Sequence, residues 1–127
     1  MSLGTLKVHL LEAHLTRDTE TFGKMDPYCK MVYRDQHWKS SVHSGGGKNP
    51  HWEGQHFAVD VKYEGDELEY SIFDDDVGDD DFVGSGKTKV AALTIHGGFD
   101  EWFTIQHKGK DSGRVHLKGE WHPHHHH

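Results

Sequence analysis

Residues 73–84 read Phe-Asp-Asp-Asp-Val-Gly-Asp-Asp-Asp-Phe-Val-Gly, with six aspartates in eight positions. Segments of alternating apolar and polar residues precede and follow this run, so it is expected to be a loop between two strands. Like charges on one short loop repel one another, and a bound divalent cation would relieve that repulsion. Oxygen-only ligands on a flexible loop favour calcium over zinc, which prefers nitrogen and sulfur. A solvated acidic loop without an ion is the alternative.

The flanking segments belong to a series of short stretches with the same alternation. In the first stretch Leu6, Val8 and Leu10 are apolar and the residues between them are polar, which places one face on a core and the other in water. Strands are expected at residues 6–10, 28–33, 38–43, 56–61, 68–72, 83–90, 101–106 and 114–121, and a short helix at 90–95. Eight short strands in 127 residues indicate an all-β fold, an eight-stranded antiparallel Greek-key sandwich.

A second acidic stretch lies between the first and second expected strands. It runs Asp18-Thr19-Glu20-Thr21-Phe22-Gly23-Lys24-Met25-Asp26. The aspartate run joins the fifth strand to the sixth. Because both connections leave odd-numbered strands, both can lie at the same end of a sandwich. Carboxylates from two loops that are distant in sequence are therefore expected to form one acidic cup.

Composition limits the partners and the location that are expected. The net charge of −7 argues against nucleic acid, which is bound by basic surfaces. No segment is apolar enough to cross a membrane and no signal-peptide pattern opens the chain, so a cytoplasmic protein is expected. Cys29, the single cysteine, lies in an alternating run and is interpreted as a buried thiol. The closing histidines, residues 124–127, resemble a purification tag and carry no functional argument.

The order and spacing of several motifs resemble those of the C2 domain, a calcium- and phospholipid-binding module. These motifs are Leu6-Lys7-Val8, Gly23-Lys24-Met25-Asp26-Pro27-Tyr28, Asn49-Pro50-His51-Trp52-Glu53, Asp81-Phe82-Val83-Gly84 and Gly113-Arg114-Val115-His116-Leu117. The resemblance covers residues 5–121 as a single domain and leaves 122–127 as a tail with the tag remnant. The chain is similar in particular to small single-domain members, the elicitor-responsive and phloem proteins of plants. An extra strand at the end of the chain looks like the circularly permuted, type II strand order.

The resemblance also implies a set of calcium ligands. The candidates are Asp18, Glu20, Asp26, Asp74, Asp76, Asp80 and Asp81, for one to three calcium ions. The aspartate run is one residue shorter than is usual in the family, so Asp80 either replaces Asp81 or assists it. In the first loop, one ligand position of the family falls at Glu20, and Asp18 is the alternative.

The function implied by the resemblance is calcium-dependent binding to phospholipid membranes, with reversible peripheral association. An acidic cup without calcium repels anionic lipid, and one that holds calcium repels it less. Phe22 and Val77 are expected at the loop tips, where apolar side chains can enter the headgroup region. A Phe22 side chain folded back onto the rim is the alternative for that residue. For the whole domain, the alternative is a calcium-independent protein-interaction or scaffold module.

Two other possibilities have weaker support. Lys30 and Lys39 could lie side by side and form a basic patch of the kind that some family members use for phosphoinositides, but a solvated face is the simpler interpretation. An enzyme is not expected. The segment Gly86-Lys87-Thr88 lacks the earlier glycine of a phosphate-binding loop, and no nucleophile or general base is set apart from the candidate ligands.

Overall fold

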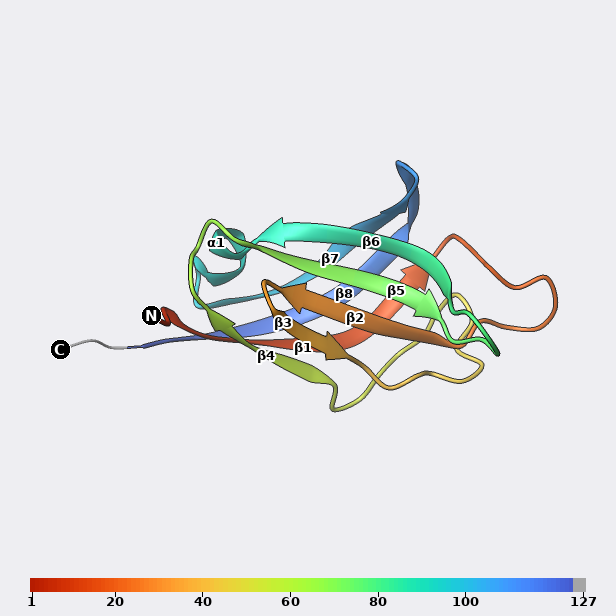
Figure 1. The fold of residues 1–127 in the computed structure, drawn as a ribbon, viewed down its shortest axis with the longest axis horizontal. Helices are drawn as coiled ribbons and strands as arrows, with labels where there is room; N and C mark the ends of the chain where they lie inside the picture. The colour runs from red at the N-terminus through yellow and green to blue at the C-terminus, as the bar shows by residue number, and fades with distance from the viewer. Residues whose placement is uncertain (125–127) are drawn as a thin grey trace.

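The computed structural model describes residues 1–124, which form eight β-strands and one short helix (Figure 1). The elements are β1 (Gly4–Leu15), β2 (Pro27–Tyr33), β3 (Gln36–Lys39), β4 (His56–Val61), β5 (Glu67–Asp74), β6 (Asp81–Lys89), α1 (Val90–Thr94), β7 (Gly98–His107) and β8 (Lys110–Pro123). The all-β prediction and the short helix after residue 89 are confirmed. No helix within residues 1–124 has the length and apolar character needed to cross a membrane. Residues 125–127 of the expected tag lie outside the described residues.

The strands form two antiparallel layers that pack face to face. One layer has the order β3-β2-β5-β6 and the other has the order β7-β8-β1-β4. A single residue pair, Ser85 and Gln106, joins β6 to β7 and so connects the layers. The last strand, β8, pairs with β1 from Gly4 to Leu15, as the type II order requires.

Two glycines let β6 pass close to its neighbours. A Cβ atom on Gly86 would lie 2.6 Å from the carbonyl oxygen of Thr104, and one on Gly84 would lie 2.0 Å from Ser112 Oγ. Neither distance leaves room for a side chain, which explains why the alternating pattern of β6 is interrupted by glycine at both positions.

A bulge in β1 keeps apolar side chains inside the sandwich over the full length of the strand. Up to Leu10 the even-numbered residues are buried, whereas Glu12 is exposed. The pairing with β8 shifts between Leu10 and Glu12, so that Ala13 and Leu15 return to the core. Full burial of a leucine side chain contributes roughly 1.5–3 kcal/mol. The bulge therefore extends the stable core to the point where the first acidic loop begins.

β3 lies near the predicted position but has different bounds, so the prediction of a strand over residues 38–43 is wrong in its limits. The Ser40 hydroxyl accepts a hydrogen bond from the Cys29 N–H at 2.9 Å, a bond that a backbone carbonyl would accept in a regular ladder. The chain still follows β2 beyond this point, because the His43 N–H donates to the Pro27 carbonyl at 2.9 Å. Cys29 itself is fully buried, as predicted.

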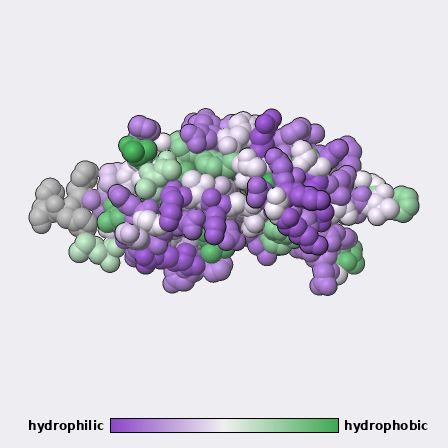
Figure 2. All heavy atoms as spheres, turned by 90° about the horizontal axis from the view of Figure 1, so that it is seen from above, coloured by the Kyte–Doolittle hydropathy of each residue, from purple (hydrophilic) through white to green (hydrophobic). Residues whose placement is uncertain are grey.

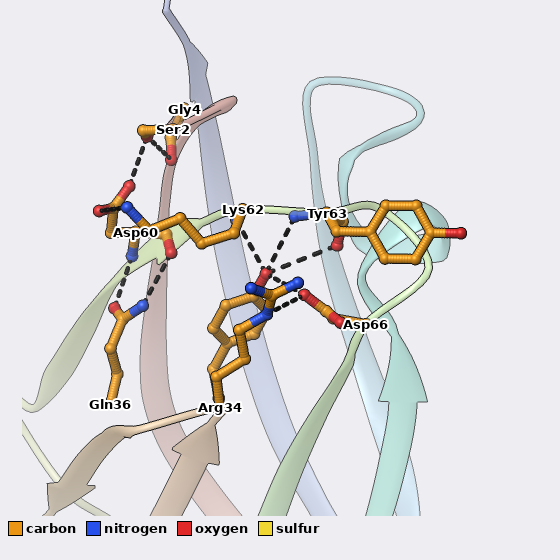
Figure 3. Close-up of polar contacts among 9 residues, drawn as sticks. Ser2, Gly4, Arg34, Gln36, Asp60, Lys62, Tyr63 and Asp66 are labelled. Carbon is orange, nitrogen blue, oxygen red and sulfur yellow. Dashed lines mark hydrogen bonds and ion pairs between the residues drawn. The ribbon is translucent and has the colours of Figure 1, made fainter.

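A polar network around Tyr33 holds the end of the sandwich away from the acidic loops (Figure 3). The Tyr33 hydroxyl accepts hydrogen bonds from the N–H groups of Lys62 (2.8 Å) and Tyr63 (3.2 Å). It donates to Asp66 at 2.6 Å, and Arg34 Nε donates to the same carboxylate oxygen at 2.6 Å. The tyrosine hydroxyl and then the guanidinium hold the pKa of Asp66 below its usual range. We refer to these five residues as the Tyr33 network.

Gln36 joins β3 to β4, which are edge strands of different layers (Figure 3). Its side-chain amide donates to the carbonyl oxygen of Asp60 and accepts from the Asp60 N–H, both at 2.8 Å. These two bonds copy the exchange between directly paired residues of antiparallel strands. One side chain thus connects the layers where no backbone ladder does.

Candidate metal centre

Three loops meet at the end of the sandwich opposite the Tyr33 network (Figure 1). They are the β1–β2 loop (16–26), the β3–β4 loop (40–55) and the β5–β6 loop (75–80). The Asp75 N–H donates to the Asp26 carbonyl at 2.9 Å, and the Gly47 N–H donates to the Met25 carbonyl at 3.0 Å. The expectation that both acidic loops share one end is therefore confirmed.

Three carboxylates from the two acidic loops converge at this end. Glu20 comes from the β1–β2 loop, Asp76 from the β5–β6 loop and Asp81 from the first position of β6. One oxygen of each residue lies within 4.8 Å of the other two. Oxygens on opposite sides of a calcium ion, each about 2.4 Å from it, are separated by about 4.8 Å. The three carboxylates therefore have the spacing and the oxygen chemistry that one calcium ion requires.

Asp74 lies beneath these residues and ties the loops together. Its carboxylate is fully buried and accepts hydrogen bonds from the Asp26 N–H at 2.8 Å and the Thr19 hydroxyl at 2.9 Å. Asp26 in turn accepts a hydrogen bond from the Gly45 N–H at 2.7 Å. Each carboxylate oxygen has two acceptor sites, so these bonds leave capacity for an ion. The ligand roles of Asp74 and Asp26 stay predictions. We refer to Glu20, Asp74, Asp76 and Asp81 as the acidic cup.

The remaining two candidate ligands are hydrogen-bonded away from the three converging oxygens. Asp18 accepts a hydrogen bond from the Glu20 N–H at 2.9 Å, which orients the backbone at Glu20. Asp80 is hydrogen-bonded to the Tyr28 hydroxyl and to the Asp76 N–H, the latter at 3.1 Å. The hydroxyl, the N–H and then Lys39 hold the pKa of Asp80 low. The structure thus brings Glu20 rather than Asp18, and Asp81 rather than Asp80, into the cluster.

Electrostatic repulsion within the acidic cup is visible at Glu20. Its pKa is raised to about 7, first by a hydrogen bond to the Asp74 carboxyl and by the charge of that group, and further by the charges of Asp76 and Asp81. A carboxyl group that holds its proton near neutrality has too little positive charge around it. A divalent cation would supply that charge and displace the proton.

Apolar side chains project from the rim of the acidic cup. Phe22 is 89% exposed and Val77 is fully exposed. The alternative in which Phe22 folds back onto the rim is therefore wrong. The molecular surface in Figure 2 is largely hydrophilic, with apolar atoms at the tip where the β1–β2 loop projects. Large apolar groups on a projecting loop are typical of an interaction surface.

The two lysines are directly opposite each other on β2 and β3, as the sequence suggested. Lys30 Nζ lies 4.7 Å from the Phe73 ring centroid, and Lys39 Nζ lies 4.4 Å from that of Tyr28. These cation–π contacts hold both charges over aromatic side chains at the flank of the β5–β6 loop. Sequence reasoning did not anticipate these contacts, nor the hydroxyl of Thr19 on Asp74. No sequence signal identifies either, since both depend on contacts between segments that are distant in the chain.

Known proteins with similar sequences share this arrangement of motifs. The family model of the C2 domain matches residues 4–105. Human extended synaptotagmin-3 is 34% identical over 122 residues, which cover 93% of this chain and 13% of that protein. Extended synaptotagmin-2-B of Xenopus laevis is 35% identical over 124 residues, 93% of this chain and 14% of that protein. The chain therefore spans a small part of the length of these relatives.

Solved structures show the same fold. The first two C2 domains of extended synaptotagmin 2, calcium bound, match with a TM-score of 0.83 and 30% identity over 95% of this chain and 46% of that chain. A C2 domain-containing protein from an elicitor-responsive gene matches with a TM-score of 0.79 and 30% identity over 98% of this chain and 92% of that chain. The motifs, the fold and the family match together show that the chain belongs to the C2 domain family.

Proposed function

We propose that this domain binds calcium in the acidic cup and thereby docks on phospholipid membranes. The observation that carries the proposal is the convergence of Glu20, Asp76 and Asp81 within 4.8 Å, above a buried Asp74. The calcium-bound structure of extended synaptotagmin 2, at 30% identity, supports calcium as the ion. The number of ions proposed is one to three, with Asp26 and Asp74 as the residues that would complete a first site or build a second.

The proposed mechanism is an electrostatic switch that needs no large movement. Without calcium, the carboxylates of the acidic cup repel the anionic surface of a membrane. Each calcium ion brings two positive charges and removes that repulsion. Phe22 and Val77 then enter the headgroup region, and each contributes up to roughly 1.5–3 kcal/mol on full burial. The resulting association is peripheral and reversible, and a cytoplasmic location is proposed with it. No catalytic step is assigned to the domain.

Calorimetric titration tests the calcium site. Calcium is added to tag-free, chelator-treated protein in the presence of magnesium, so that general charge screening is not counted as a site. We expect micromolar to submillimolar binding that Asp76→Asn weakens at least tenfold, since a charged ligand is lost. The matched control is Asp79→Asn, which removes the same charge from an exposed residue outside the three-oxygen cluster.

Two results would contradict the proposal. If the wild type releases no heat with calcium and its unfolding is unaffected by the ion, the acidic cup is not a calcium site and a protein-interaction scaffold becomes the working model. If Asp79→Asn weakens binding as much as Asp76→Asn does, calcium is attracted by the overall charge of the loop and not held by the cluster.

A further inference from the structure

Orphaned polar atoms gather at the hairpin between β7 and β8. Within residues 1–124, four side-chain nitrogen or oxygen atoms are buried without a hydrogen-bond partner: Arg17 Nε, Trp52 Nε1, His107 Nδ1 and Ser112 Oγ. His107 ends β7 and Ser112 lies in the first part of β8, so two of the four belong to the hairpin. Arg17 lies against it, because its N–H donates to the Ser112 carbonyl at 3.4 Å. Buried polar atoms of this kind normally have a partner, so their concentration at one place calls for an explanation.

The three arginines of the chain differ in what their guanidinium groups contact. Arg34 is paired with Asp66, with 2.6 Å between Nε and the carboxylate. Arg114 lies over the ring of Trp102, with 5.3 Å from Cζ to the ring centroid. Arg17 has no ion pair and no side-chain hydrogen bond to a described residue, although its Nε is removed from solvent. A guanidinium nitrogen buried without an acceptor costs free energy that an anionic ligand would recover.

The charge around Arg17 is positive. The pKa of His107 is lowered by burial and then by the charges of Arg17 and Lys108, and no carboxylate counteracts them. Asp111, the acidic residue of the hairpin, accepts a hydrogen bond from the Gly113 N–H at 2.8 Å. A partly buried arginine, a histidine and a lysine therefore share one region without a partner of opposite charge among the described residues.

This region borders the acidic cup. Arg17 directly precedes Asp18, and the His107 ring packs on Phe82 with 5.6 Å between centroids. Phe82 directly follows Asp81 of the acidic cup. Lys108 and Gly109 form the hairpin turn with φ values of 51° and 76°, and this turn leaves the Lys108 side chain exposed. In Figure 1 the hairpin stands beside the start of the β1–β2 loop, at the end that carries the acidic cup.

We propose that Arg17, His107 and Lys108 form a binding site for a phosphate oxyanion beside the acidic cup. The planar guanidinium presents several donors in a geometry that matches phosphate oxygens, and Lys108 adds a mobile charge at the open side. The phosphate can belong to a phospholipid headgroup or to a soluble phosphate. The lipid source rests on the proposed function of the domain, whereas the anion site itself does not require calcium.

The first experiment uses inorganic phosphate and tag-free protein in chelator. Side-chain ¹⁵N NMR follows the Arg17 Nε–H and the His107 ring nitrogens, with chloride at equal ionic strength as the reference. We expect saturable shifts of both signals with phosphate, and an affinity about tenfold weaker in Arg17→Gln, since a charged donor is lost. Arg17→Lys keeps the charge without the fork and tests the site if Arg17→Gln does not fold. Lys110→Gln is the matched control, because Lys110 is on the same hairpin but is not among the charges that act on His107.

The second experiment identifies the source of the phosphate. Sedimentation with phosphatidylcholine vesicles containing phosphatidic acid is measured in calcium for the wild type, Arg17→Gln and Lys110→Gln. About tenfold weaker vesicle binding of Arg17→Gln alone supports the lipid phosphate. Phosphate shifts in NMR without a vesicle effect support a soluble phosphate.

Failure of this inference can be told from failure of the proposed function. The site is overturned if neither phosphate nor vesicles distinguish Arg17→Gln from the wild type, or if Lys110→Gln weakens binding equally, which would indicate diffuse attraction by the hairpin. Asp76→Asn separates the two sites. It should abolish calcium-dependent vesicle binding while leaving the phosphate shifts of Arg17 unchanged.

Discussion

Asp66 and Glu20 are loop carboxylates at opposite ends of the same sandwich, and their surroundings differ in kind. Asp66 is held by Tyr33 and Arg34, and its pKa is lowered. Glu20 faces Asp74, Asp76 and Asp81, and its pKa is raised to about 7. The chain supplies the positive partner at one end and leaves the other end without one. Acidic residues that the fold itself satisfies are structural, whereas a cluster that it leaves unsatisfied requires a cation from outside.

The largest effect that tests this contrast is stabilisation by calcium. At a free concentration one hundred times the Kd, calcium should raise the free energy of unfolding by about 2.7 kcal/mol, because the ion binds the folded state. Thermal unfolding of the wild type and of Asp76→Asn, each with calcium and with chelator, measures this difference. We expect the stabilisation in the wild type alone. Equal stabilisation of both proteins would show that the acidic cup is not the cause.

The second test removes the partner at the opposite end. Tyr33→Phe deletes the hydroxyl that accepts from Lys62 and Tyr63 and donates to Asp66, so the free energy of unfolding should fall by about 1–3 kcal/mol. Urea denaturation in chelator measures it, and calcium affinity should not change. Tyr63→Phe is the control, because only the backbone of Tyr63 takes part in the network. If both variants lose the same stability, the hydroxyl network does not hold this end.

A third, smaller effect compares exposed apolar side chains at the two ends. Phe22 is 89% exposed beside the acidic cup, and Ile95, after α1, is 72% exposed. In calcium, Phe22→Ala should weaken vesicle binding about tenfold, a change of about 1.4 kcal/mol, because insertion buries the ring. Ile95→Ala should leave it unchanged, as should the unfolding free energy of Phe22→Ala. A loss with Ile95→Ala equal to that with Phe22→Ala would move the membrane contact away from the acidic cup.

The smallest predicted effect is on pH dependence, and the two ends should have opposite signs. The folded-state pKa of Glu20 lies above its model value of 4.5, so its contribution to stability is present below pH ~4.5 and is lost as pH rises toward 7. The pKa of Asp66 is lowered in the folded state, so its contribution is present above its ordinary pKa and is lost as pH falls through the folded value.

Chemical denaturation of calcium-free protein across this range measures the Glu20 contribution. Glu20→Gln should flatten the decline between pH 4.5 and 7, because it removes the titrating group. Calcium should flatten it as well, since binding requires the ionised carboxylate. Calcium binding at about pH 6 should then release protons in calorimetry with buffers of different ionisation enthalpy. An unchanged decline in Glu20→Gln would contradict the assignment.

The sequence predicts the parts of this architecture that depend on strand period and on counting connections. Alternation locates the strands, and the odd-numbered origin of both acidic loops correctly brings Glu20 near Asp76. The resemblance to the C2 family supplies the candidate ligands. What the sequence cannot supply depends on contacts between distant residues. Asp80 and Asp81 are equivalent as sequence, and only the Tyr28 hydroxyl distinguishes them by turning Asp80 aside.

Two further features were beyond prediction for the same reason. The end of β3 depends on a single hydroxyl, that of Ser40, which replaces a backbone carbonyl of the ladder. The cationic region around Arg17 consists of residues from the end of β1 and the β7–β8 hairpin, about ninety positions apart in the sequence. No local pattern indicates that Arg17 lacks a carboxylate partner while Arg34 has one.

The pairing of β1 with β8 also determines how the domain responds to mechanical tension. Gly4 is opposite Pro123, so both ends of this strand pair lie together, away from the acidic cup. A force that pulls these ends apart acts along the interstrand hydrogen bonds, which in an antiparallel pair are perpendicular to the strands. The rungs would then break one after another, as in a zipper, at low force. A force between a membrane held at the loops and either end would instead run along the strands and load many rungs at once, so the domain would resist pulling best while it is docked.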